Sequence, residues 1–202
     1  MPNPTRRHLA IILDRSGSMN RIKDDAEGGL KAFLAAQQTH PAETLVSLYL
    51  FDHRYEVVYE YQPLDDIPDL VLLPGGKTAL LDAIGTSVTR MREHLAAMPE
   101  GERPSEIIVV ILTDGHENAS VRWRSRTEIR RLIEEHTSQG WTFHYLDATP
   151  DAFTKAAHFG INPDTTLQFS TDRTLEALTR LGRVTSHGED GFTDDDRDAT
   201  RH

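Results

Sequence analysis

Four short apolar runs constrain the fold of this chain more than any other feature of its sequence. They are residues Leu9 to Leu13, Leu45 to Phe51, Ile107 to Leu112 and Trp141 to Leu146. The first and the third are almost uninterrupted in apolar side chains, which is typical of strands that are covered on both faces. Such strands occur in parallel sheets whose connections are helices, so the pattern favours an α/β domain.

Segments with helical spacing separate these runs. The clearest of them carries an apolar stripe over several turns, formed by Leu80, Leu81, Ile84, Val88, Met91, Leu95 and Met98. Further helices are expected around Ile22 to Gln37, Ile129 to His136, Ala152 to Ala157 and Leu175 to Leu181. In the first of these, Gly28 and Gly29 would each cost about 1 kcal/mol relative to alanine. Close packing against a strand would explain both glycines.

The remaining strands complete a three-layer, Rossmann-like fold. Tyr55 to Tyr61 follows Phe51 too closely for a crossover, so we expect an antiparallel edge strand there. Thr166 to Phe169 is the expected sixth strand of a mostly parallel sheet with helices on both faces. Residues 1–185 are therefore predicted to form one domain. Residues 186–202 are acidic, with one aromatic side chain, and are predicted to be a disordered tail.

The composition excludes several classes of function. A chain of 202 residues that is 38% hydrophobic is long enough for one sizeable core. It has no cysteine, which excludes disulfides, thiolate metal sites and cysteine nucleophiles. Its formal net charge of -10 repels phosphate backbones and anionic lipids, so neither nucleic acid nor a membrane is an expected partner. The polar N-terminus lacks a signal-peptide core, and we expect a cytoplasmic protein.

Oxygen-bearing side chains gather where the apolar strands end. Ligands bind outside the carboxyl ends of strands in open α/β sheets. Three loops are therefore candidate binding loops: Asp14-Arg15-Ser16-Gly17-Ser18, Thr113-Asp114-Gly115, and Pro74 to Thr78 before the helix with the clearest apolar stripe. Hard cations such as Mg²⁺ take oxygen ligands and need only one or two carboxylates from the protein. The candidate metal ligands are therefore Asp14, Ser16, Ser18, Thr78 and Asp114.

These five residues, in this order, resemble the metal-ion-dependent adhesion site (MIDAS) of von Willebrand factor A domains. The resemblance covers roughly Leu9 to Leu181, and Tyr145 to Phe169 is also similar to small bacterial intracellular members of that family. It implies a bound Mg²⁺ or Mn²⁺ that Ser16, Ser18 and Thr78 contact directly or nearly so. Asp14 and Asp114 would act directly or through water. It further implies an open coordination position for an Asp or Glu carboxylate of a partner protein, and no catalysis.

Two enzymatic interpretations use the same residues. Gly76-Lys77-Thr78 before a helix, with Asp114 after an apolar strand, is similar to part of the P-loop of nucleotide-hydrolysing enzymes. That motif requires another glycine five positions before Gly76, where Val71 stands. Alternatively, Asp14 would be the nucleophile of a phosphotransferase. Enzymes of that kind usually carry a second aspartate where Ser16 stands, so the general acid would be missing.

Three further features carry less specific signals. His116 is the histidine expected nearest to Ser16 and Ser18, but no nucleophile-elbow sequence accompanies them. His116 and Glu117 are expected either to line the rim of the metal site or to be solvated, and the same two alternatives hold for Asn118. A basic patch, formed by Arg122, Arg124, Arg126, Arg130 and Arg131, is either a solvated helix face or a docking surface, and Trp123 favours docking.

Overall fold

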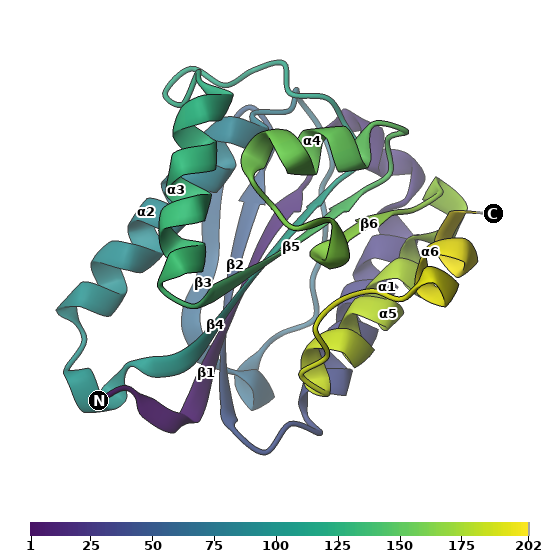
Figure 1. Cartoon of the computed structure of the whole chain (residues 1–202). Coiled ribbons are helices and arrows are strands. Elements are labelled where there is room, and N and C mark those ends of the chain that lie inside the picture. The colour runs from purple at the N-terminus through teal and green to yellow at the C-terminus, as the bar shows by residue number, and fades with distance from the viewer. Residues whose placement is uncertain (202) are drawn as a thin grey trace.

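The computed structural model describes residues 1–201, and a six-stranded sheet forms its central layer (Figure 1). The strands are β1 (Asn3–Asp14), β2 (Glu43–Phe51), β3 (Tyr55–Pro63), β4 (Pro104–Thr113), β5 (Trp141–Asp147) and β6 (Thr166–Gln168). Their order is β3-β2-β1-β4-β5-β6, and β3 pairs antiparallel with β2 while the other pairs are parallel. The predicted mostly parallel sheet with one antiparallel edge strand is confirmed.

Helices cover both faces of this sheet (Figure 1). One layer holds α1 (Lys23–Gln37), α5 (Thr174–Ser186) and α6 (Asp194–Arg201), and the other holds α2 (Leu80–Ala97), α3 (Arg126–Ser138) and α4 (Ala152–Phe159). Short 3-10 turns lie at Gly17–Arg21, Leu64–Asp66, Glu100–Glu102, Pro163–Thr165 and Thr171–Arg173. Within residues 1–201, no helix is long and apolar enough to cross a membrane.

Strand β1 shows why the apolar runs are nearly continuous. Successive side chains of a strand point to opposite faces of the sheet. Leu9, Ile11 and Leu13 accordingly belong to the core beneath α1 and α5, whereas Ala10 and Ile12 belong to the core beneath α2 and α3. Both faces of this central strand are buried, so apolar side chains are favoured at both sets of positions.

The two adjacent glycines of α1 have different surroundings. A Cβ atom at Gly29 would lie 2.7 Å from Cδ1 of Leu178, so this glycine allows α1 to approach α5 closely. A Cβ atom at Gly28 would have no atom within 4 Å. The expectation that both glycines pack against a strand is therefore wrong, because Gly29 meets a helix and Gly28 faces open space.

The C-terminal residues differ from the disordered tail that we expected. Asp194–Arg201 forms α6, and the Phe192 ring before it is buried edge-on against His144. The Asp196 carboxylate is 1% exposed and accepts hydrogen bonds from Arg180 (3.1 Å) and Arg183 (2.7 Å) of α5. One aromatic ring and one ion-paired carboxylate attach this segment to the domain, and a low apolar content does not reveal such contacts.

Candidate metal centre

The parallel pairing of β1 with β4 brings the first two predicted loops together. Leu13 pairs with Leu112, so Asp14 at the end of β1 lies beside the point where β4 ends. Asp14 is fully buried, and its carboxylate accepts hydrogen bonds from the Ser16 amide (2.7 Å) and the Thr113 hydroxyl (2.6 Å). The Asp14 side chain therefore joins both loops and holds the first one in its turn.

The two serine hydroxyls connect Asp14's loop to Asp114. The Oγ atoms of Ser16 and Ser18 are 3.1 Å apart, and Ser18 Oγ donates to Asp114 Oδ1 at 2.5 Å. Ser16 is buried, whereas Ser18 is partly exposed to solvent. Four of the five predicted residues thus form one continuous polar cluster at the carboxyl end of the sheet.

The fifth predicted residue, Thr78, lies on the same rim. A Cβ atom built at Gly115 would be 3.0 Å from Thr78 Oγ1 and 3.5 Å from Ser18 Oγ, so both hydroxyls reach the space beside this glycine. The Gly75 amide donates to the carbonyl of Arg15 at 2.8 Å, which joins Thr78's loop to the loop after β1. The structure therefore brings all five predicted residues together.

The electrostatics of this cluster favour a cation. Oδ2 of Asp114 is buried and has no hydrogen-bond partner within the described residues. Burial raises the pKa of Asp14 to about 6, to which the nearby charge of Asp114 adds, and burial also raises the pKa of Asp114. No group of three or more His, Asp or Glu side chains within residues 1–201 is arranged to hold a metal. The cluster therefore surrounds this space with two carboxylates and three hydroxyls.

A lysine whose side chain is 11% exposed supports the loop after β4, and the sequence analysis missed it. Lys155 of α4 donates to the carbonyl oxygen of Gly115 (3.1 Å), to Asp147 Oδ2 (3.0 Å) and to Thr149 Oγ1 (2.7 Å). Asp147 is fully buried at the end of β5, beside the end of β4. The available signal was an aspartate that ends an apolar strand, followed by a lysine on the next helix.

Glu117 and Asn118 accept hydrogen bonds from the Thr78 loop and the start of α2. The Asn118 side chain accepts a hydrogen bond from the Thr78 amide at 2.9 Å, and Glu117 accepts one from the Leu81 amide at 2.9 Å. Both therefore support the start of α2. His116 remains largely exposed, with its Nδ1 atom 4.0 Å from Asp151 Oδ2.

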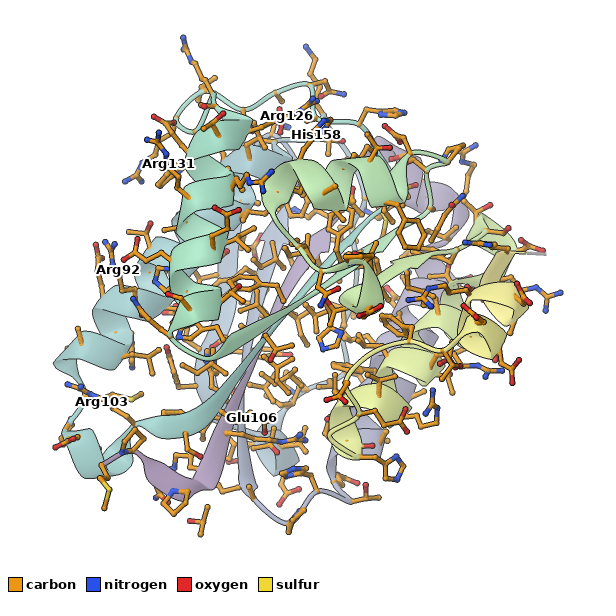
Figure 2. All side chains as sticks on the ribbon, viewed as in Figure 1. Arg92, Arg103, Glu106, Arg126, Arg131 and His158 are labelled. Carbon is orange, nitrogen blue, oxygen red and sulfur yellow. The ribbon has the colours of Figure 1, made fainter. Side chains whose placement is uncertain are left out.

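Trp123 packs against α2 and remains partly exposed. A Cβ atom at Gly85 of α2 would lie 2.3 Å from the Trp123 ring, so the tryptophan packs closely on that helix. Arg126 and Arg131 of the basic patch project outward from α3 (Figure 2). Both arginines are exposed, and docking at this patch stays a prediction.

Comparison with known proteins gives matches at the level of structure. No family model matches the sequence, and no curated protein matches it. Proximal thread matrix protein 1 (PTMP1) from the mussel byssus matches with a TM-score of 0.67 and 13% identity over 91% of this chain and 49% of its own. The vWF domain of the type V pili tip protein Mfa5 from Porphyromonas gingivalis matches with a TM-score of 0.63 and 9% identity, over 95% of this chain and 99% of its own.

A third match is manganese-loaded TRAP protein from Plasmodium vivax, with a TM-score of 0.61 and 12% identity over 88% of this chain and 73% of its own. The sheet order and the polar cluster at its carboxyl end define a Rossmann-like domain with a strand-end site. The chain folds, more specifically, as a von Willebrand factor A domain. It spans about half the length of PTMP1.

Proposed function

We propose that this chain is a divalent-metal-dependent protein-binding module whose metal is held by Asp14, Ser16, Ser18, Thr78 and Asp114. The observation that carries the proposal is the buried, unpartnered Oδ2 atom of Asp114 beside a group of hydroxyls. A buried carboxylate oxygen without a donor is costly, and a bound cation removes that cost. Two proteins of similar fold support it, since one PTMP1 structure has a zinc-occupied MIDAS motif and the TRAP structure is manganese-loaded.

The donor set fits a hard cation. All five side chains offer oxygen, and Mg²⁺ and Mn²⁺ prefer oxygen ligands, whereas zinc is usually held by cysteine and histidine. Both oxygens of Asp14 already accept hydrogen bonds, so we assign this residue to orient the Ser16 loop and to supply negative charge. Asp114 has the free oxygen and is the carboxylate that we assign to the ion.

The proposed partner is a protein that presents an Asp or Glu carboxylate. Hydroxyls are weak, neutral ligands, so a cation held by three of them keeps much of its affinity for an anion. The ion would then bridge two acidic surfaces, which accounts for an acidic ligand on a chain of net charge -10. Because this net negative charge repels phosphate groups, we propose no nucleic acid or membrane partner. A cytoplasmic location is also part of the proposal.

The geometry weighs against the two enzymatic interpretations. A P-loop binds phosphate with free backbone amides at the start of a helix. Here the amides of Thr78, Ala79 and Leu81 donate to Asn118, to the Asp52 carbonyl and to Glu117, respectively. Asp14 is fully buried with both oxygens accepting hydrogen bonds, so it is poorly placed to attack a phosphate.

Thermal and urea unfolding with added Mg²⁺ or Mn²⁺ tests the metal site. At a cation concentration of 100 times Kd, the native state gains about 2.7 kcal/mol. We expect Thr78→Val and Asp114→Asn to lose most of this gain, because each keeps the side-chain shape and removes one ligand. The exposed Asp172→Asn is the matched control and should respond like the wild type. An equal response in all four proteins would mean that the cation binds elsewhere.

A second arm of this experiment tests the carboxylate partner. Water bound to Mn²⁺ shortens the relaxation time of solvent protons, and a carboxylate that displaces the water reverses the effect. Acetyl-glutamate amide should reverse it with the wild-type protein, whereas acetyl-glutamine amide should not. If the two compounds act alike, the metal site does not select carboxylates.

A further inference from the structure

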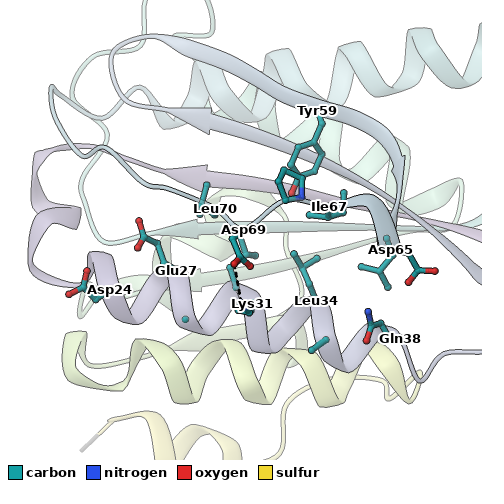
Figure 3. Close-up of a pocket in the computed structure, with 15 residues that line it drawn as sticks. Asp24, Glu27, Lys31, Leu34, Gln38, Tyr59, Asp65, Ile67, Asp69 and Leu70 are labelled. Carbon is teal, nitrogen blue, oxygen red and sulfur yellow. Dashed lines mark hydrogen bonds and ion pairs between the residues drawn. The ribbon is translucent and has the colours of Figure 1, made fainter.

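A groove separate from the metal centre runs along α1, beneath the segment that joins β3 to α2 (Figure 3). Its volume is about 500 Å³, within the range typical of ligand-binding sites. Leu34 on one side and Ile67 and Leu70 on the other make its floor apolar. These three side chains are only partly buried against the core, so they leave apolar surface at the groove.

The groove is elongated. Its lining residues extend from Asp24, in the first turn of α1, to Gln38, the residue that follows the helix. At 1.5 Å per residue this length is about 21 Å, which matches an extended peptide of about six residues. An open groove of this length is better suited to a chain segment than to a compact small molecule.

Carboxylates dominate the rim of the groove. They belong to Asp24, Glu27, Asp65 and Asp69, against one lysine, Lys31. Lys31 is already paired with Asp69 at 3.0 Å, and Glu27 is paired with Lys23 at 2.8 Å. Asp24 is 97% exposed and lies 3.6 Å from the same Lys23, so two lysines face four carboxylates. Asp65 has no ion pair within the described chain. The unneutralised charge is therefore negative and faces any occupant.

Gly28 independently supports an open groove, because it leaves this part of the groove free of a side chain. It lines the groove in the interior of α1, where glycine costs about 1 kcal/mol relative to alanine. Its neighbour Gly29 has a packing reason, the contact with Leu178, whereas a Cβ atom at Gly28 would meet nothing within 4 Å. A side chain at position 28 would project into space that an occupant needs, and this is the physical reason we assign to the glycine.

We propose that this groove binds a segment of a partner protein, about six residues long, in which lysine or arginine alternates with aliphatic side chains. The aliphatic side chains would cover Leu34, Ile67 and Leu70, and the basic side chains would pair with Asp24 and Asp65. Successive side chains of an extended segment point to opposite sides, so one face would enter the groove. The interaction does not involve the metal centre.

Fluorescence polarisation tests this proposal in EDTA, so that the outcome does not depend on a bound metal. The probe is a fluorescein-labelled hexapeptide of alternating leucine and lysine. We expect Gly28→Phe to weaken its binding by about ten-fold or more, because the ring fills the groove. The matched control is Gly101→Phe, since Gly101 is also exposed with nothing within 4 Å of a built Cβ atom. Circular dichroism verifies that both variants fold.

Three results would overturn the proposal. The first is equal binding of a peptide in which glutamate replaces lysine, because the acidic rim would then play no part. The second is equal affinity of the wild type and Gly28→Phe, because the peptide would then bind elsewhere on the acidic surface. The third is full competition by hexyltrimethylammonium at the peptide's own concentration, because the site would then accept a small cation. Asp65→Asn should weaken binding of the lysine peptide and leave the glutamate peptide unaffected.

Discussion

Alanine substitution at two adjacent glycines is expected to change stability in opposite directions. Gly28→Ala should stabilise the fold by about 0.5–1 kcal/mol, because it restricts the unfolded chain and meets no atom in the folded one. Gly29→Ala gains the same helix propensity, but its Cβ atom would lie 2.7 Å from Leu178 Cδ1 and 3.3 Å from the Leu175 Cα atom. Overpacking of this kind costs about 1–3 kcal/mol, which leaves a net loss of up to about 2.5 kcal/mol, with a central value of about 1 kcal/mol.

Urea unfolding followed by circular dichroism measures this difference of about 2 kcal/mol between the variants. The transitions should have equal slopes, so that the shift in midpoint reports the native state. A double-mutant cycle with Leu178→Ala isolates the contact, because the smaller side chain makes room for the new methyl group. Equal stability of the two single variants would refute the close approach of α1 to α5 at Gly29.

Two further predictions concern the C-terminal segment and the pH dependence. Asp196→Ala removes the carboxylate that accepts hydrogen bonds from Arg180 and Arg183, so it should destabilise by about 1–3 kcal/mol. Amide hydrogen exchange should accelerate in Asp194–Arg201 more than in β1, and equal acceleration would contradict a local role. Burial lowers the pKa of His144 to about 4, so the folded state resists a proton that the unfolded state binds near pH 6.5, and stability falls as pH drops through this window. Between pH 7 and pH 5, the free energy of unfolding of His144→Leu should therefore fall by about 2 kcal/mol less than that of the wild type, as measured by urea unfolding. An equal fall in both proteins would contradict the lowered pKa of His144.

The order of elements could be predicted because it depends on patterns that are local in sequence. Continuous apolar runs marked the strands, and the 3.6-residue spacing from Leu80 to Met98 marked α2. The short Asp52–Arg54 link made β3 antiparallel, because no crossover fits into it. These rules need no knowledge of which side chains meet.

The candidate ligands could also be predicted, because strand ends in an open parallel sheet share one edge. Their supports could not be predicted. Lys155 reaches the Gly115 carbonyl from a helix 40 positions away, and Asn118 holds the Thr78 amide across a similar separation. Such contacts depend on how helices and loops pack against the sheet, and a single sequence carries no local signal for them.

The amino-acid sequence by itself determined the strand and helix order of this protein and the set of oxygen-bearing side chains at one edge of its sheet. Only the tertiary structure decided the different roles of Gly28 and Gly29 and the attachment of α6 through Phe192 and Asp196. The physical reason is that periodicity and turn chemistry act between neighbours along the chain. The cost of a Cβ atom, or the gain from a buried ion pair, is set by atoms that only folding brings within a few ångströms.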